Sequence, residues 1–443
     1  MKKRVWKRVF LALGAALLLT GLSGCSREEL NRQLAESLGT LGLYENNEPV
    51  ESPKMKAERE LREKEEARES ERDAILERAR EKADIYDYSA ALDILDEIDE
   101  DYQEDEAVVE AKIEYQQKLG QMEDYQGDIA HLCFSSVIVD TDRAFDGDGN
   151  ASTYNMWSVT VDELNAILEF LYENNYVLID VHETISEVED EEENVTYIRV
   201  YPQVPEGKTP LIISQEGVNY YSYTLEDGFA QRLVLDDDGN VKALYVDENG
   251  TEQIGNYDLI PILDAFVEAH PDFSLRGARG IVSLTGYEGA YGYRIQDTES
   301  ETLEEDRAAV QAIGDRLVET GWEIASSGYS HSSMSGMTYE ELVSDTDSWM
   351  ELIGAYAGSA DILLFPFGDE VEFPGDKLSY LLDNGFRFFC GLWGNEDYLS
   401  VQSTYVRQTR RNVSGYIMHY YPEYLEEFFD VSAVLDGARP AFE

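Results

Sequence analysis

A regular alternation of short apolar runs with amphipathic segments most constrains what this chain can fold into. The apolar runs have the length of strands and cover residues 130–139, 176–181, 209–214, 280–285, 322–326, 362–365 and 386–390. Segments with helical periodicity separate most of them and cover residues 161–172, 259–269, 303–320, 339–354 and 376–384. Strands that alternate with helices pair in parallel through βαβ units. We therefore predict an α/β fold, with a single (β/α) barrel rather than two small domains.

Acidic residues dominate the charge of the chain. Its 443 residues include 91 Asp and Glu against 35 Lys and Arg, which gives a formal net charge of −56. A field of this sign repels phosphate backbones, so we expect no nucleic-acid partner. Hydrophobic residues make up 43% of the chain, which is enough for a large packed core and excludes a wholly disordered chain.

The first 24 residues have the organisation of a secretory signal peptide. A basic stretch at residues 2–8 precedes an apolar run at residues 9–22, which is short for a bilayer span. The run ends at Leu22-Ser23-Gly24-Cys25, which resembles the bacterial lipobox, whose cysteine is lipidated. We predict that Cys25 carries a diacylglycerol and an acyl chain such as palmitate, which together anchor a protein stably in a lipid bilayer. The expected location is the extracytoplasmic face of a bacterial cell membrane.

Composition divides the rest of the chain into three parts. Residues 25–54 are predicted to be a linker. Residues 55–120 combine a charged, solvated helix with two periodic runs that look like one tetratricopeptide-type helical hairpin. One such hairpin cannot bury its faces alone, so it either docks against its neighbours or belongs to a peptide-binding array. Residues 125–443 contain the predicted barrel.

Five short segments between residues 140 and 368 point to a known family. They are Asp140–Phe145, Tyr176–Asp180, Val218–Tyr221, Trp322–Ser326 and Phe365–Gly368. Together they resemble the polysaccharide deacetylases, the NodB homology group, and they follow one another in the family's order. More narrowly, the chain looks like a branch found in surface lipoproteins of Firmicutes. This resemblance implies a distorted (β/α)7 barrel preceded by the α-helical stalk and hairpin.

The resemblance also implies a hydrolase that acts on carbon–nitrogen bonds other than peptide bonds. Members of the family remove an acetyl group from an N-acetylated sugar. A divalent metal, commonly zinc, polarises the amide carbonyl and activates water. One Asp and two His hold the metal, in agreement with the three ligands and one open position that catalytic zinc needs. A second Asp acts as the base.

This sequence keeps the family's frames and loses most of the metal ligands. Glu216 falls at the position of the base, and Gly217 falls at that of the metal-binding Asp. Ser327 falls at the first His and His331 at the second, so His331 is the one ligand position retained. The arginine of a third family frame is also missing from residues 364–367. Because a neutral hydroxyl does not replace an imidazole as a zinc ligand, we expect no cofactor.

Two functions from different classes remain open. The first is a catalytically degenerate protein, a pseudoenzyme, whose barrel mouth binds cell-wall glycan or peptidoglycan. The residues expected to contact the glycan are Asn219, Tyr220, Tyr221, Tyr329, Phe367, Asp369 and Trp393. Aromatic side chains offer flat faces to sugar rings, although the same residues could instead belong to the core. The second function is an active deacetylase with a remodelled site, in which Glu216, His331 and Asp369 hold zinc or another divalent metal. A third, weaker hypothesis is a scaffold whose helical stalk recruits a protein partner.

Overall fold

The computed structural model describes residues 44–45, 48–49, 53–190, 195–393 and 396–442. The chain divides into two units, one reaching to Glu77 and including Ile98–Tyr102, the other formed by Arg78–Glu97 and Gln103–Glu443. The predicted signal peptide and Cys25 lie outside the described residues. Within the predicted linker, β1 (Tyr44–Glu45) and β2 (Glu48–Pro49) pair antiparallel.

The helix α3 (Pro53–Asp84) is strongly charged over its first turns. Its side chains form ion pairs four residues apart, such as Lys54–Glu58 at 3.3 Å and Arg59–Glu63 at 2.7 Å. Exposed pairs of this kind stabilise a helix by only about 0.2–0.5 kcal/mol each. The first turns of α3 therefore depend on local charge pairs and helix propensity more than on burial.

A helical hairpin follows, formed by α4 (Tyr88–Asp96) and α5 (Glu106–Leu119), which are in contact along their length. An aspartate caps each helix, and the hairpin buries Ala91, Leu95 and Val108. The loop before α4 is tied to the barrel, because the backbone N–H of Arg276 donates to the carbonyl of Ile85 at 2.8 Å. Between residues 53 and 190 the structure shows no second hairpin of this type.

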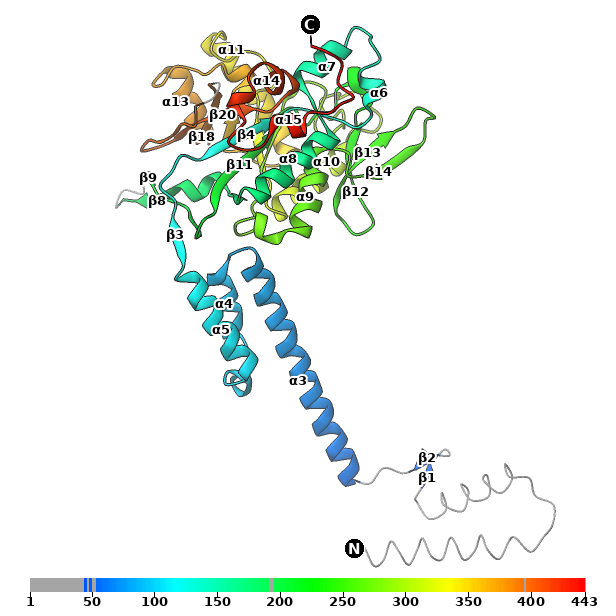
Figure 1. Cartoon of the computed structure of the whole chain (residues 1–443), viewed down its shortest axis with the longest axis vertical. Coiled ribbons are helices and arrows are strands. Elements are labelled where there is room, and N and C mark those ends of the chain that lie inside the picture. Colours follow the sequence, from blue (N-terminus) through cyan, green and yellow to red (C-terminus); the bar gives the residue numbers. More distant parts are fainter. Residues whose placement is uncertain (1–43, 46–47, 50–52, 191–194, 394–395, 443) are drawn as a thin grey trace, which may run out of the picture. The chain divides into compact units, whose positions relative to one another are not determined.

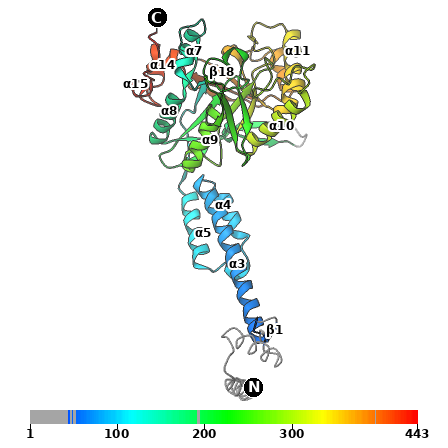
Figure 2. The same ribbon diagram turned by 90° about the vertical axis from the view of Figure 1, so that its right-hand side faces the viewer.

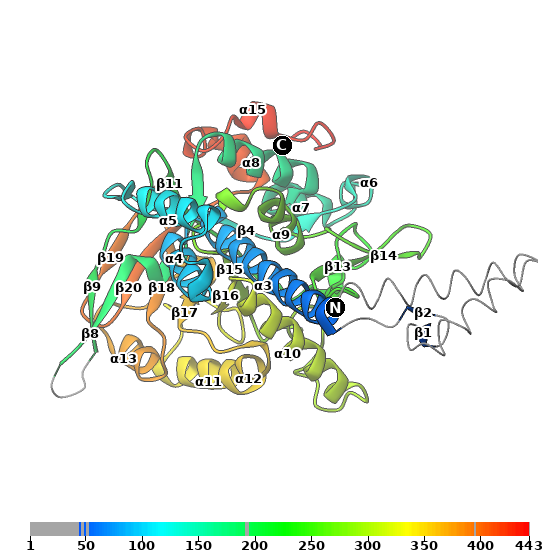
Figure 3. The ribbon, with the colours of Figure 1, turned by 90° about the horizontal axis from the view of Figure 1, so that it is seen from below.

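Seven parallel strands close into a barrel (Figure 1 and Figure 3). In ring order they are β4 (Ala130–Phe134), β11 (Thr209–Gln215), β15 (Ile281–Leu284), β16 (Glu323–Ser326), β17 (Ile362–Leu364), β18 (Phe388–Leu392) and β20 (Val406–Asn412). The ring closes where β20 pairs with β4, with Arg411 beside Leu132. The predicted (β/α)7 barrel is therefore confirmed.

Helices cover the outside of the ring. They are α8 (Val161–Glu173), α9 (Leu259–Ala269), α10 (Leu303–Glu319), α11 (Tyr339–Trp349) and α13 (Asp376–Asp383). Figure 2 shows α8 and α10 on opposite sides of the strands. A capping box starts α8, because Thr160 and Glu163 satisfy each other's backbone N–H groups. A second capping box, between Thr338 and Glu341, starts α11.

Two strands depart from the sequence-based expectation. The predicted strand at 176–181 forms β7 (Tyr176–Leu178), but it lies outside the ring, where it pairs with the start of β11 and bridges to Ser274. The seventh ring strand is β20, a polar segment that no apolar run announces. Because β7 occupies the first residues of β11, β15 pairs only with its last two, Ser214 and Gln215. This shared edge distorts the barrel.

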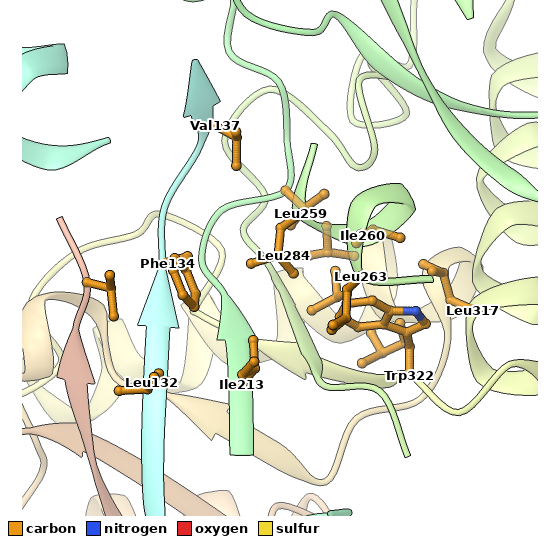
Figure 4. Packing of buried hydrophobic residues seen from close by; sticks show 14 of the residues in the cluster. Leu132, Phe134, Val137, Ile213, Leu259, Ile260, Leu263, Leu284, Leu317 and Trp322 are labelled. Carbon is orange, nitrogen blue, oxygen red and sulfur yellow. The ribbon is translucent and has the colours of Figure 1, made fainter. Parts of the chain in front are cut away.

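Residues of the ring strands alternate between two apolar layers. Ile212 and Phe388 belong to the layer inside the barrel, while Ile213 and Phe389 belong to the layer under the helices. This is the period of two that a strand imposes. Figure 4 shows the outer layer, where Leu263 of α9 lies beside Trp322. Both layers are closed to water, so the barrel is a packed core with its chemistry confined to its ends.

One ionisable side chain inside the barrel gives a pH prediction. His131 is fully buried, and its Nδ1 lies 3.1 Å from Oε1 of Gln408. Burial, with Arg410 nearby, lowers the pKa of His131 from 6.5 to about 3. The unfolded chain therefore binds a proton between these two values that the folded chain does not. This contribution to stability is complete above pH 6.5 and is lost progressively as the pH falls toward 3.

We expect the free energy of unfolding of the wild type to fall by up to about 1.4 kcal/mol per pH unit more steeply than that of His131→Gln between pH 5.5 and 4. Urea titrations of both proteins at a series of pH values measure the two slopes. Parallel slopes would show that His131 does not stay neutral in the fold.

Smaller elements complete the chain. The strands β12 (Arg232–Leu235) and β13 (Val241–Val246) form an antiparallel hairpin, and β14 (Glu252–Gly255) pairs with β13. The other short strands are β3 (Met122–Asp124), β5 (Val137–Ile138), β6 (Val159–Thr160), β8 (Ile185–Glu189), β9 (Val195–Arg199), β10 (Gln203–Pro205) and β19 (Leu399–Val401). The short helices are α6 (Thr141–Ala144), α7 (Ala151–Trp157), α12 (Ala355–Ala357), α14 (Gly415–Tyr420) and α15 (Val431–Val434). Among the described helices, none has the length and apolar character needed to cross a membrane.

Candidate functional site

The loops after the carboxyl ends of β11, β15, β16 and β17 form the mouth of the barrel. Glu216 follows β11, His331 lies in the loop after β16, and Phe367 lies just beyond β17. In barrels of this type the carboxyl ends of the strands carry the functional residues, while the opposite end serves stability. The predicted site residues therefore come from several loops at one end of the barrel.

A buried arginine holds Glu216. Arg410 of β20 has a fully buried side chain and forms an ion pair with the carboxylate of Glu216, which is 27% exposed. The same guanidinium donates to the carbonyls of Phe365 at 3.1 Å and Gly391 at 3.2 Å. Burial alone would lower the pKa of Arg410, but the charge of Glu216 outweighs it and the pKa is raised. Glu216 thus neutralises a buried cation.

Sequence reasoning missed this arginine. It found no arginine in the third family frame, and the structure supplies one from a different strand. Val406–Asn412 contains no apolar run, so nothing in the local sequence announced a barrel strand there.

The hydroxyl of Tyr221 lies close to Gly217, the position at which the sequence resemblance leads us to expect a metal-binding Asp. Gly217 has a φ of +63°, and a Cβ added there would lie 2.9 Å from the Tyr221 hydroxyl oxygen. A side chain at this position meets both a backbone conformation that favours glycine and an occupied space. Burial raises the pKa of Tyr221 to about 12, so the hydroxyl stays protonated. A neutral hydroxyl therefore lies over Gly217.

Ser327 and His331, the positions at which the resemblance leads us to expect two histidines, follow β16 and make different contacts. Ser327 is fully buried, and its Oγ donates to the carbonyl of Leu364 at 3.0 Å. Its hydroxyl is therefore already used in the barrel wall. His331 has a φ of +51°, and its ring centroid lies 5.1 Å from that of Phe367. Burial lowers the pKa of His331, and the charge of Glu216 offsets part of this effect.

A carboxylate of α11 fixes the loop that carries His331. Asp345 accepts hydrogen bonds from the backbone N–H groups of Tyr329 and Ser330, both at 2.8 Å. Asp345 is only 8% exposed. The loop at the mouth is held by buried charge-assisted hydrogen bonds, which are stronger than neutral ones.

The mouth does not supply the donor set of a catalytic zinc site, which needs three protein ligands. Among the described residues, the one group of three His, Cys, Asp or Glu side chains whose ligand atoms lie within 4.8 Å of one another is Asp180, His182 and Glu323. That group lies at the opposite end of the barrel. The shifted set of Glu216, His331 and Asp369 is therefore not brought together, and we derive no chemical step through a metal at the mouth.

Three tyrosines gather at the mouth. The rings of Tyr221 and Tyr223 stack with centroids 5.5 Å apart and planes 7° apart, and the ring of Tyr287 lies 5.8 Å from that of Tyr221. Tyr223 is 55% exposed and Tyr287 is 57% exposed. Of these three residues, the sequence pointed to Tyr221 alone. The spacing Tyr221-x-Tyr223 was visible in the sequence, but Tyr287 comes from the loop after β15, so only folding brings it to the other two.

A hollow adjoins the tyrosines. Its volume is about 640 Å³, and its lining is rich in hydroxyl groups, including Ser330, Ser332 and Ser333 with Tyr329. Tyr329 packs against Gly286, the residue before Tyr287: a Cβ at Gly286 would lie 2.0 Å from the Tyr329 ring. The loop that lines the hollow thus contacts the loop that carries Tyr287.

The other predicted glycan contacts divide into residues that are accessible and residues that are not. Phe367 is 65% exposed at the edge of the mouth, and Asp369 is also exposed. Asn219 is fully buried, and its Nδ2 donates to the carbonyl of Thr285 at 2.9 Å. Tyr220 is 9% exposed, and its hydroxyl donates a hydrogen bond to the carboxylate of Asp258. The prediction that Asn219 and Tyr220 contact a glycan is therefore wrong, because their polar groups organise the loop from inside.

The ring of Trp393 is only partly accessible to a ligand. Its Nε1 donates to Glu370 at 2.6 Å, the guanidinium of Arg407 lies 5.1 Å from its ring centroid, and the ring of Tyr398 lies 4.9 Å away. These neighbours already contact the indole. The structure gives Trp393 a packing role, and Tyr223, Tyr287 and Phe367 offer more exposed ring surface.

Comparisons with known proteins return similarities of structure only. No family model and no curated protein sequence matches the chain. A solved structure of the Streptococcus pyogenes deacetylase PplD in complex with acetate is similar at a TM-score of 0.37 and 9% identity, over 69% of this chain and 99% of that one. A Mycobacterium smegmatis protein assigned as a polysaccharide deacetylase is similar at a TM-score of 0.22 and 13% identity, over 66% of this chain and 62% of that one. Likenesses this weak carry no argument about function, which has to come from the residues at the mouth.

Proposed function

We propose that this chain is a lipid-anchored surface protein whose barrel mouth binds a glycan without hydrolysing it. The sequence resemblance to polysaccharide deacetylases supports a sugar as the ligand. One observation carries the non-catalytic part of the proposal: Arg410 neutralises Glu216 while the Tyr221 hydroxyl lies over Gly217. The positions that would hold the base and a metal ligand are thus engaged in the packing of the barrel.

The exposed aromatic surface supports glycan binding. Tyr223, Tyr287 and Phe367 keep more than half of their surface exposed although each belongs to an ordered loop at one end of the barrel. Aromatic rings supply large contact faces, and a few polar groups beside them fix the orientation of a ligand. Here the serine hydroxyls around the 640 Å³ hollow provide those groups. A polymer of N-acetylated sugars, such as peptidoglycan, has both the flat faces and the hydroxyl and amide groups to match.

Substitution of Tyr287 tests the binding site. We expect Tyr287→Ala to weaken the binding of peptidoglycan fragments or chito-oligosaccharides by about tenfold. The loss of one aromatic stacking face costs about 1.4 kcal/mol, which corresponds to this factor. Isothermal titration calorimetry on the full chain measures the effect. Tyr201→Ala is the matched control, because Tyr201 is 43% exposed and lines a groove that also contains Asp180, away from the mouth. Equal losses in both variants would contradict binding at the mouth.

An acetate-release assay separates the proposal from the alternative of an active deacetylase. Glycan incubated with the chain, with and without added Zn²⁺, should release no acetate. Acetate release that disappears in Glu216→Gln would show that the mouth is a working site and would refute the non-catalytic reading.

The membrane anchor rests on the signal peptide and lipobox alone. We expect a fatty-acid analogue to label the wild type and not Cys25→Ala in cells, with the labelled protein in the membrane fraction. Equal labelling of the two proteins would exclude Cys25 as the site of lipidation.

A further inference from the structure

A compact group of acidic side chains and one imidazole lies at the base of the barrel, opposite the mouth. Asp180 and His182 follow β7, Glu323 begins β16, and Asp361 immediately precedes β17. Nδ1 of His182 lies 2.6 Å from Oδ1 of Asp180, and Nε2 lies 3.1 Å from Oδ2 of Asp361. Ligand atoms of Asp180, His182 and Glu323 all lie within 4.8 Å of one another. Three segments far apart in the sequence thus place their polar groups around one point.

We propose that Asp180, His182 and Glu323 form a binding site for a divalent transition-metal cation at the base of the barrel. Two carboxylates and one imidazole are a donor set that Zn²⁺, Mn²⁺, Co²⁺ or Fe²⁺ accepts, with the remaining positions open to water. The chain offers this set nowhere else among its described residues. The site is distinct from the mouth, so it does not depend on the proposed function.

Asp361 supplies a second feature that is typical of metal sites. Metal-binding histidines typically donate the N–H of their other ring nitrogen to a carboxylate, which fixes the tautomer and the orientation of the ring. The two nitrogens of His182 face different carboxylates. A cation bound by Asp180 and Glu323 would therefore replace the proton between Nδ1 and Asp180, while the Nε2–H donates to Asp361. An acidic cluster without an oriented imidazole would lack this feature.

The charge of the group also calls for a cation. Three carboxylates face one histidine, and in the part of the chain that the structure describes no lysine or arginine forms an ion pair with Asp180, Glu323 or Asp361. Elsewhere in the barrel, partly buried carboxylates such as Glu370 and Asp397 each have an arginine partner. His182 is the basic side chain that pairs with Asp180 and Asp361, and a divalent cation would add positive charge beside the three carboxylates.

Solvent reaches the group from two sides. Asp180 and His182 line a groove of about 470 Å³, and Glu323 and Asp361 line another hollow of about 800 Å³. The side chains of Asp180 and His182 are each 35% exposed. A hydrated cation can therefore approach without local unfolding and keep some of its water. The expectation that the chain binds no cofactor rests on the residues at the mouth and does not concern the residues at the base of the barrel.

Metal titration tests the proposal. Mn²⁺, Zn²⁺ and Co²⁺ are each titrated into the chelator-stripped full chain, with calorimetry for Mn²⁺ and Zn²⁺ and visible absorption for Co²⁺. We expect one equivalent of at least one cation to bind, and a Co²⁺ spectrum that reports a nitrogen ligand. Glu323→Gln and Asp180→Asn should weaken binding by more than about 100-fold, and Asp361→Asn by about 10- to 100-fold.

Glu183→Gln is the matched control. Glu183 lines the same groove and is next to His182 in the sequence, but it pairs with Arg276 and is not in the donor set. The affinity of the Glu183→Gln variant for the cation should equal that of the wild type. Circular dichroism melting of the cation-free proteins checks that the variants fold. If one variant does not fold, the Co²⁺ spectrum of the wild type still tests the proposal. The proposal is overturned if no cation binds at one equivalent, or if Glu183→Gln and Glu323→Gln lose affinity equally.

Discussion

Glu216→Gln should lower the free energy of unfolding by about 3 kcal/mol, the lower end of the cost of breaking a buried ion pair. Glutamine keeps the shape of the side chain and removes only the charge. The guanidinium of Arg410, which is 0% exposed, then remains buried without a counter-charge. Its bonds to the carbonyls of Phe365 and Gly391 persist, so the loss reports the charge alone. Urea unfolding of both proteins measures the difference.

An exposed ion pair provides the control for this experiment. Arg316 and Glu319 lie 2.8 Å apart on α10, with side chains 31% and 70% exposed. Glu319→Gln should cost no more than about 1 kcal/mol, because water screens the pair. The double variant Glu216→Gln, Arg410→Met should regain part of the lost stability, since it also removes the buried cation. A cost for Glu216→Gln no larger than for Glu319→Gln would show that Arg410 does not need its partner.

The second large effect concerns the C-terminal segment. Arg439→Met should lower the free energy of unfolding by about 3–5 kcal/mol, because it leaves the carboxylate of Glu163 buried and unpaired. The two side chains are 2% and 0% exposed. Arg439 also donates to the backbone carbonyls of Asn155 at 2.8 Å and Ser158 at 2.7 Å. The residue therefore holds the end of the chain against the start of α8.

Arg316→Met on the surface of α10 is the matched control, with an expected cost below about 1 kcal/mol. Limited proteolysis adds a local measurement, since the C-terminal residues should become cleavable in Arg439→Met before the barrel unfolds. If the two methionine variants unfold at the same urea concentration, the Glu163–Arg439 pair does not stabilise the fold.

The candidate site was partly readable from the sequence. Glu216, Gly217, Ser327 and His331 could be placed at one mouth because each follows an apolar run that forms a parallel strand. Exposure could not be read in the same way. Asn219 and Tyr220 sit in the same segment as Tyr221, yet they point into the loop and are buried. One backbone turn decides which of three neighbouring polar residues meets solvent.

The sequence by itself determined the α/β class, the barrel and the residue types that stand at the mouth. Apolar runs and helical periodicity are local properties, and folding cannot restore a side chain that Gly217 lacks. Tertiary structure alone decided that Val406–Asn412 completes the ring, because its buried arginines are stable in a strand only beside carboxylates distant in sequence, such as Glu216 and Asp397. It likewise decided the tyrosine group and the joining of Asp180, His182, Glu323 and Asp361 at the base. These sites consist of contacts between distant segments, which no local pattern of polarity specifies.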